Sequence, residues 1–408
     1  MSHLILSAFL ALMLGTAVLP AQSILFHPAT DSALITGIAL HDEIWRAATP
    51  AQSVLPREAV AALFGDRNAN GMLDDGPTRF DALAVTATGG VLVSLASNAV
   101  LTNGTTVLDG DVLRIDPAAP LSVVWTEAMF AAATGTSTVD VDAFAIGING
   151  ELYFSFEDDE VTSSAALLAQ NGGNSMLDEQ CVFRLDPTQS EATLRLSQAA
   201  VVALFNTAFG GNATSVVDTT GIEIDPTDST ALWITSASSA TALRGRIVST
   251  RNGGTPVSSG GTVFEPMAFG FTGNFALDSL ALGTLSWPVV RLAPTTGSVS
   301  AGGNGQVVVE QASPMGQVQL VVTATVVPGP FGIPSLWAGW PGVHVNPADP
   351  LFALSLSSTE LTLLADIGGT ASYGFSFAGM SPGIQAVVQA VELSTLRVST
   401  PAVLTVTV

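Results

Sequence analysis

One loop of the sequence has the spacing of oxygen ligands that a calcium ion requires. Between residues 66 and 75 oxygen-bearing side chains stand at alternate positions, and a glycine follows where a calcium loop turns sharply. The candidate ligands are Asp66, Asn68, Asn70, the carbonyl of Met72, Asp74 and Asp75. The loop is not an EF-hand, because Pro77 stands at the twelfth position in place of a bidentate glutamate. We expect this loop to bind Ca²⁺; the alternative is an Asx-rich turn without a metal.

A second set of residues has the chemistry of a ligand surface. More than half of the 34 acidic residues fall in loops that separate short apolar strands. The candidates for this surface are Asp140, Asp142, Glu157, Asp158, Asp159, Trp337 and Trp340. Carboxylates gathered on one face repel one another unless cations or salt screen them. The bland alternative is that the acids simply occupy solvated loops, and a carboxylate pair could also serve glycosidic chemistry.

Trp337 and Trp340 lie in a loop rich in glycine and proline, at residues 328–344. If this loop is exposed, its tryptophans could stack on sugar rings or contact a partner protein. Such aromatic residues more often cover the end of their own domain, which is the alternative. Replacement of both tryptophans by alanine separates the two interpretations.

Residues for nucleophilic or acid–base catalysis are sparse. The histidines beyond the amino-terminal apolar segment are His27, His41 and His344, and none has a second histidine at a metal-ligand spacing. Cys181 lies in a strand-like segment, which predicts a buried and inert thiol. The letters Gly-Met-Ser-Pro-Gly at 379–383 match a nucleophile elbow, but no helix is expected after them.

The elements that must position these residues are short strands arranged in repeats. Four segments match as a first strand, and they start at Asp81, Asp142, Thr220 and Asp278. Second strands are predicted at 91–95, 152–156 and 231–235, third strands at 112–117, 182–187 and 246–250, and fourth strands at 126–131 and 197–205. The amino-terminal repeat has a second, third and fourth strand at 23–28, 43–48 and 57–64, but no first strand.

Four strands in each repeat are typical of β-propeller blades. The segment 278–282 supplies the first strand that the amino-terminal repeat lacks. We therefore predict an all-β chain with a four-bladed β-propeller at 22–288, closed by amino- and carboxy-terminal strands. Its repeats lie near 23–64, 81–133, 142–205 and 220–270, and 278–282 is the closing strand. A β-sandwich with degenerate repeats is the competing fold.

From residue 289 the predicted strands become longer and alternate between apolar and polar residues. They lie at 289–298, 306–311, 317–327, 351–364, 371–377, 384–393 and 399–408. This pattern predicts an immunoglobulin-like β-sandwich at 289–408. The segments 291–303, 344–349 and 385–408 resemble a carboxy-terminal sandwich module of uncharacterised secreted bacterial proteins, and 140–145 is similar to the propeller-like repeats of such proteins. The resemblance implies a fold and an extracellular setting, and no activity.

Charge and the amino terminus bear on partners and location. The chain has 12 Lys and Arg against 34 Asp and Glu, and its net charge of −22 argues against nucleic acid and anionic membrane surfaces as partners. The apolar run 4–19 predicts a secretory signal peptide at 1–21, with an uncleaved membrane anchor as the alternative. No later segment predicts a membrane span. With a single cysteine, the secreted chain must fold without an intramolecular disulfide.

Together these features favour a secreted, non-enzymatic protein, located outside the cell or at its surface. Its acidic propeller face would bind Ca²⁺ and an extracellular polymer or a surface protein. The alternative is a secreted hydrolase, dependent on carboxylates or a metal and acting on glycans. Two carboxylates in a cleft at the separation of a glycosidase pair would favour the enzyme.

Overall fold

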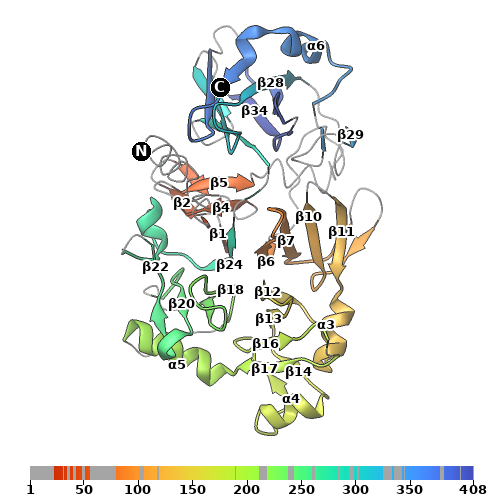
Figure 1. The fold of residues 1–408 in the computed structure, drawn as a ribbon, viewed down its shortest axis with the longest axis vertical. Coiled ribbons are helices and arrows are strands. Elements are labelled where there is room, and N and C mark those ends of the chain that lie inside the picture. Colours follow the sequence, from red (N-terminus) through yellow and green to blue (C-terminus); the bar gives the residue numbers. More distant parts are fainter. Residues whose placement is uncertain are drawn as a thin grey trace, which may run out of the picture.

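The protein is composed mostly of β-sheet, as the sequence predicts (Figure 1). The structure is a computed structural model. It describes residues 23–30, 32–34, 37–39, 43–47, 51–55, 80–100, 105–116, 119–188, 190–210, 218–237, 243–259, 262–283, 285, 287–293, 298–300, 303–324, 333–334, 342–343, 345–376, 381–395 and 397–407. The predicted signal peptide and the predicted calcium loop lie outside these residues. Within them, no helix is long and apolar enough to cross a membrane.

Four antiparallel sheets of four strands each occupy residues 23–283. Sheet I has the order β24 (Leu277–Gly283), β1 (Ser23–Pro28), β4 (Ile44–Arg46) and β5 (Gln52–Leu55). Sheet II contains β6 (Phe80–Val85), β7 (Val91–Leu95), β10 (Val112–Asp116) and β11 (Ala119–Trp125). Sheet III contains β12 (Val141–Ile146), β13 (Leu152–Phe156), β16 (Val182–Leu185) and β17 (Thr193–Leu196). Sheet IV contains β18 (Gly221–Ile224), β19 (Leu232–Thr235), β20 (Val248–Ser249) and β21 (Thr255–Pro256).

The predicted pairing of the two distant segments in sheet I is confirmed. Strand β1 pairs antiparallel with β24, with Phe26 opposite Leu280 and His27 opposite Ser279. The first strands of the four sheets, β6, β12, β18 and β24, are called the inner strands here. Each inner strand contacts the next in the cyclic order β6, β12, β18, β24 and back to β6, and Figure 1 shows them nearest the common centre of the sheets.

The predicted fourth strands at 126–131 and 197–205 are wrong. These segments form the helices α3 (Glu127–Thr134) and α5 (Gln198–Phe209), and the fourth strands are β11 and β17 just before them. Thr126 and Ser197 cap the two helices by accepting hydrogen bonds from backbone N–H groups, and Gly135 and Gly210 end them with a left-handed φ. These caps outweigh the apolar runs that suggested strands.

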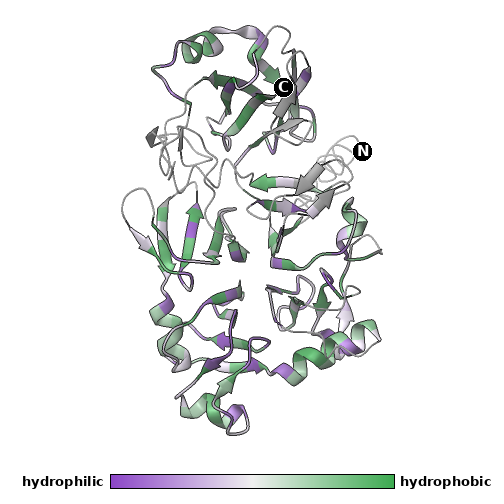
Figure 2. Ribbon diagram, turned by 180° about the vertical axis from the view of Figure 1, so that it is seen from behind, coloured by the Kyte–Doolittle hydropathy of each residue, from purple (hydrophilic) through white to green (hydrophobic). Residues whose placement is uncertain are grey.

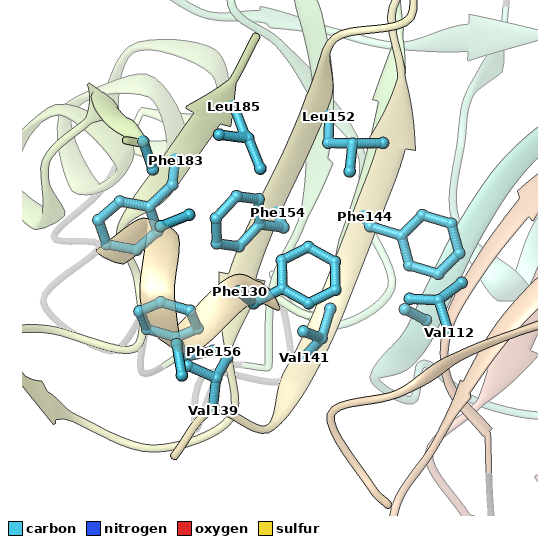
Figure 3. Packing of buried hydrophobic residues seen from close by; sticks show 14 of the residues in the cluster. Val112, Phe130, Val139, Val141, Phe144, Leu152, Phe154, Phe156, Phe183 and Leu185 are labelled. Carbon is cyan, nitrogen blue, oxygen red and sulfur yellow. The ribbon is translucent and has the colours of Figure 1, made fainter. Parts of the chain in front are cut away.

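Buried phenylalanines fill the space between α3 and sheet III (Figure 3). The ring of Phe130 in α3 lies 5.0 Å from that of Phe154, and Phe156 stacks on Phe183 at 4.8 Å. Hydrophobic residues predominate along the strands of the sheets (Figure 2). Such burial is the main source of stability here, because the single cysteine, Cys181, is free and buried as predicted.

Two further sheets form from residues 289–407. One has the order β25 (Val289–Ala293), β27 (Asn304–Glu310) and β32 (Ala371–Ser376). The other has the order β26 (Ser298–Ser300), β34 (Ala402–Thr407), β33 (Gln385–Glu392), β28 (Gln317–Thr323) and β31 (Thr362–Leu364), with β26 parallel to β34. Val309 of the first sheet and Leu320 and Val388 of the second belong to one buried core.

The predicted strand at 351–364 is wrong for most of its length. Helix α6 (Pro350–Ser357) occupies its first part, followed by the 3₁₀ turn η3 (Thr359–Leu361), and only β31 is extended. Asp349 caps α6 by accepting a hydrogen bond from Leu351 N, and Pro350 stands at the first helical position. Proline is favoured there because its missing N–H would have no partner within the helix.

The remaining elements are short. They are the strands β2 (Ser32–Leu34), β3 (Gly37–Ala39), β8 (Ala99–Val100), β9 (Thr106–Val107), β14 (Glu160–Val161), β15 (Met176–Leu177), β22 (Ser258–Ser259), β23 (Thr262–Val263), β29 (Ile333–Pro334) and β30 (Gly342–Val343), with α4 (Ala165–Gln170), η1 (Arg251–Gly253) and η2 (Pro266–Phe269). Among the described residues, each of these strands pairs only with its neighbour in sequence.

The junction between the two groups of sheets is buried. Leu285, Trp287 and Val289 pack in the same core as Ile44 and Leu55 of sheet I. Across this junction an ion pair joins Arg46 Nη2 of β4 to Glu310 Oε2 of β27 at 3.5 Å. The two groups of sheets are therefore joined by a shared apolar core and by an ion pair.

Glu392 gives the carboxy-terminal sheets a sensitivity to acid. Its Oε2 accepts a hydrogen bond from Arg397 Nε at 2.8 Å, and its Oε1 accepts one from Ser313 N at 2.6 Å. Burial alone would raise its pKa, but these bonds and one from Thr395 lower the pKa from 4.5 to about 2. The pKa of this carboxyl is lower in the folded protein than in the unfolded chain. Its contribution to stability is therefore fully present at pH values above the unfolded pKa, and it is lost as the pH falls toward the folded pKa.

We therefore expect Glu392→Gln to lower the free energy of unfolding at neutral pH by about 2 kcal/mol, because one charge-assisted acceptor is lost. Acid titration of unfolding, followed by circular dichroism, should show that the difference from the unmodified protein shrinks as the pH falls below 4.5 toward 2. A difference that stays constant over this range would contradict the assignment.

Candidate cation site

Acidic residues stand at equivalent positions on three of the four inner strands. Asp81, Asp142 and Asp278 are each the second residue of β6, β12 and β24, and Thr220 precedes β18. All three carboxylates are buried, and Asp142 is only 2% exposed. Because the inner strands lie side by side, these positions meet at one end of the strands.

Side chains from neighbouring sheets support this end of the strands. Each of these side chains contacts the residue just before Asp81, Asp142, Thr220 or Asp278 on the next inner strand. Ser94 Oγ donates to Val141 O at 2.8 Å, Ser155 Oγ donates to Thr219 O at 2.7 Å, Thr220 Oγ1 donates to Leu277 O, and the ring of His27 lies 5.8 Å from that of Phe80. The contacts run from sheet II to III, III to IV, IV to I and I to II, so the residue just before each equivalent position is contacted by the sheet before it.

Three carboxylates come together at this end. Asp81, Asp140 and Glu157 each offer an oxygen, and these atoms lie within 4.8 Å of one another. Asp140 precedes β12 and Glu157 follows β13, so both lie just beyond the pair Val141–Phe156 at the end of the β12–β13 ladder. The backbone N–H of Glu157 donates a hydrogen bond to Asp140 O. Strand pairing therefore brings Asp140 and Glu157 together, and the packing of β6 on β12 adds Asp81.

Burial and like charge disfavour a negative charge on Asp140. Desolvation, a hydrogen bond to Glu157 and the charges of Asp81, Glu157 and Asp109 raise the pKa of Asp140 from 3.8 to about 9. Without a cation, the Asp140 carboxyl holds a proton and donates it to Glu157. A divalent cation would supply the positive charge that this proton supplies.

Asp142 and Asp218 form a second pair beside this group. Burial, followed by the charges of Asp218, Asp81, Asp278 and Glu157, raises the pKa of Asp142 well above 3.8. The pKa of Asp218 is raised to about 8 by burial and by Glu179, although a hydrogen bond with Asp142 lowers it. We call Asp81, Asp140, Asp142, Glu157, Asp218 and Asp278 the acidic cluster.

The acidic cluster includes three of the residues predicted for a ligand surface, namely Asp140, Asp142 and Glu157. Asp158 and Asp159 are exposed and are not part of it. Asp159 Oδ1 accepts a hydrogen bond from Glu179 N at 3.0 Å. A ligand surface that these two exposed acids share with Asp140 stays a prediction.

The remaining predicted ligands lie outside the described residues. These are Asp66, Asn68, Asn70, Met72, Asp74 and Asp75 of the calcium loop, and Trp337 and Trp340 of the aromatic loop. Both loops stay predictions from the sequence. The buried Cys181 thiol agrees with its sequence pattern, and burial raises its pKa to about 11. His27 is buried within strand β1.

Asp81, Asp218 and Asp278 are cluster members that the sequence did not place in a site. A signal for two of them was present, because Asp81 and Asp278 begin the matched first strands, as Asp142 does. Asp218 stands two residues before Thr220, as Asp140 stands two residues before Asp142. Aligning the repeats on these positions would have identified the cluster.

The chemistry that this arrangement offers is the binding of a hard cation by oxygen ligands. The group of Asp81, Asp140 and Glu157 contains carboxylates alone, without histidine or cysteine. Such ligand sets suit Ca²⁺, Mg²⁺ or Mn²⁺ better than zinc or copper. No family model matches this chain, and no curated protein matches its sequence.

Proposed function

We propose that this is a secreted, non-enzymatic binding or structural protein whose acidic cluster binds Ca²⁺. The bound ion would hold together the ends of the inner strands and order the surface around them. An extracellular polymer or a surface protein is the partner class proposed for that surface, because the strongly acidic chain would repel nucleic acid and anionic membranes.

The proposed architecture is a four-bladed β-propeller followed by an immunoglobulin-like sandwich. In this proposal sheets I to IV are the blades, and the pairing of β1 with β24 closes the ring. The cyclic contacts of the inner strands support it. The two sheets after residue 289, which share one core, support a sandwich.

The observation that carries the calcium proposal is the crowding of carboxylate oxygens at one end of the inner strands. Three oxygens lie within 4.8 Å of one another, and beside them Asp142 Oδ2 is buried without a hydrogen-bond partner among the described residues. A buried oxygen of this kind costs free energy unless a proton or a cation lies against it. Ca²⁺ takes six to eight oxygen ligands, so carboxylates, carbonyls and water can share one ion.

The geometry favours cation binding over glycoside hydrolysis. The two carboxyls of a glycosidase stand about 5 to 9.5 Å apart, with a sugar or a water between them. Here Asp140 and Glu157 are hydrogen-bonded to each other, which is closer than that separation. The hydrolase stays an alternative that an activity assay on glycans would test.

Calorimetric titration of metal-free protein tests the proposal. We expect heat on addition of Ca²⁺ and a higher melting temperature, because only the folded state gathers the ligands. Asp140→Asn combined with Glu157→Gln should weaken Ca²⁺ binding at this site by at least about tenfold, since two charged ligands are lost. Asp158→Asn is the matched control, because this exposed acid is not part of the cluster.

The titration should be made in a chain that carries Asp74→Asn and Asp75→Asn. These changes remove the separate contribution of the predicted calcium loop. If this chain binds no Ca²⁺, or binds it equally well after the change of Asp140 and Glu157, the acidic cluster is not the site.

A further inference from the structure

We propose that the protein forms a symmetric dimer through the open edge of strand β32. In this dimer the β32 strands of two copies pair antiparallel, so that the three-stranded sheets of the two chains join into one continuous sheet. The inference goes beyond the proposed function, because it concerns the carboxy-terminal sheets and does not depend on Ca²⁺.

The first argument is that β32 is an unprotected edge strand. It is the last strand in the order β25, β27, β32, and within the described residues it pairs only with β27. Edge strands usually carry charged residues or prolines that hinder pairing with another chain. Strand β32 has neither, and the sequence contains no charged residue between Asp366 and Glu392. In a chain of net charge −22, two copies can therefore approach each other along this edge with little repulsion.

The second argument is the glycine at position 374, within this edge strand. Gly374 is exposed and its φ is not left-handed, and a Cβ added there would meet no atom of the described residues within 4 Å. Neither the backbone conformation nor packing within the described chain requires glycine here, although glycine weakens a strand. A glycine inside a strand often marks a position that another backbone approaches closely.

The third argument is that the sequence around Gly374 is self-complementary. Residues 372–376 read serine, tyrosine, glycine, phenylalanine, serine, which is the order serine, aromatic, glycine, aromatic, serine in either direction. About a two-fold axis at Gly374, Tyr373 of one copy lies opposite Phe375 of the other, and Ser372 lies opposite Ser376. Aromatic pairs and hydroxyl pairs across antiparallel strands both stabilise a sheet. This symmetry makes a second copy of the chain the expected partner.

Burial along β32 agrees with such pairing. Tyr373 and Phe375 pack on the core of the carboxy-terminal sheets, but both are only half-buried. In the dimer each of these rings gains an aromatic neighbour on the same face of the joined sheet. The pairing therefore covers apolar area that the single chain leaves accessible to water.

Apolar side chains beside this edge enlarge the contact surface. Leu364 on the edge strand β31 is 60% exposed, and Ile367 in the turn from β31 to β32 is 87% exposed. Strands β31 and β32 are in contact, so both side chains lie on the same side of the two sheets as the open edge. A stable dimer buries about 800 Å² on each partner, which is more than two short strands supply. Leu364 and Ile367 contribute part of the difference.

Sedimentation equilibrium of the full chain over a range of concentrations tests the proposal. We expect a reversible equilibrium between monomer and dimer. Gly374→Lys should raise the dissociation constant of the dimer at least about tenfold, because two ammonium groups would face each other at the two-fold axis. Gly273→Lys is the matched control and should leave the constant unchanged. Gly273 is also exposed without a left-handed φ, and a Cβ there meets no atom of the described residues within 4 Å.

Cysteine cross-linking tests the register. Residues paired across antiparallel strands have Cα atoms about 4.5 to 5.5 Å apart, within the range of a disulfide. In oxidised glutathione, Gly374→Cys should therefore form a covalent dimer and Gly273→Cys should not. The native Cys181 is buried and does not compete. Ser372→Cys should cross-link to Ser376→Cys in a mixture of the two variants, and not to itself.

Circular dichroism checks that each variant is folded. A chain that stays monomeric at every concentration would overturn the proposal and leave this edge to a partner of another kind. A dimer that Gly374→Lys does not weaken, or equal cross-linking of Gly374→Cys and Gly273→Cys, would also overturn it. Each of these results is independent of Ca²⁺ binding and leaves the proposed function untouched.

Discussion

Metal-free protein is expected to lose stability as the pH rises from about 5 to about 8, and saturating Ca²⁺ should remove most of this loss. The reason lies in the buried carboxyls of the acidic cluster. The pKa of Asp140 is raised to about 9 and that of Asp218 to about 8, from an ordinary value of 3.8 in each case, and that of Asp142 is raised as well. The folded protein therefore keeps protons that the unfolded chain releases.

The sign follows from proton linkage. A carboxyl whose folded pKa lies above its unfolded pKa contributes stability that is fully present below the unfolded value, near pH 3.8, and is lost as the pH rises through the folded value. In the proposed function Ca²⁺ would replace these protons and bind only the folded state, so it would add about 3 kcal/mol of stability at a hundred times its Kd. Protons and Ca²⁺ would therefore compete for the same oxygens.

Differential scanning calorimetry in a chelator and in millimolar Ca²⁺, at several pH values across this range, measures the effect. Asp142→Asn should flatten the dependence of the metal-free protein, because an amide does not ionise. Asp158→Asn should leave the dependence unchanged. A metal-free protein that becomes more stable with rising pH would show that the cluster is ionised and compensated without a metal.

Phe26→Ala is expected to lower the free energy of unfolding by about 3 to 5 kcal/mol, the usual cost of removing a buried phenylalanine. Phe26 is 1% exposed, and its ring lies 6.0 Å from Phe271 and 6.4 Å from Phe264. It stands opposite Leu280 in the pairing of β1 with β24. The substitution therefore loosens the contact between the two distant ends of the first group of sheets.

The same substitution should weaken Ca²⁺ binding, although Phe26 is not a ligand. Its neighbour His27 packs against Phe80, and Phe80 precedes Asp81. Asp278 lies on the partner strand β24. Loosening of β1 and β24 is therefore expected to shift Asp81, a ligand of the proposed calcium ion.

Phe205→Ala is the matched control. Phe205 is 1% exposed in α5, away from the closing strands, and its truncation should cost a similar free energy. Calcium affinity measured on the folded fraction should fall for Phe26→Ala and stay unchanged for Phe205→Ala. Hydrogen exchange should show faster opening of β1 and β24 in Phe26→Ala alone. Equal losses of affinity in both variants would mean that the effect is general destabilisation.

The strands that were predicted correctly depend on local signals. Strand β13 lies within its predicted range of 152–156, and β10 and β16 lie within theirs, because apolar residues and tight turns mark them locally. The pairing of β1 with β24 could be predicted because 278–282 matched a strand that the first repeat lacked. Helices α3, α5 and α6 were mistaken for strands, although Thr126, Ser197 and Asp349 are ordinary helix caps.

The amino-acid sequence by itself determined the prevalence of strands, the repeats, the excess of acids and the joining of the two distant segments. These features follow from composition and from patterns within a few residues. Only the tertiary structure decided which acids share a site. Asp81 meets Asp140 because β6 packs on β12, while Asp158 and Asp159, although adjacent to Glu157 in sequence, are exposed to solvent. Carboxylate chemistry depends on distances of a few ångströms between side chains, and the packing of strands far apart in sequence sets those distances.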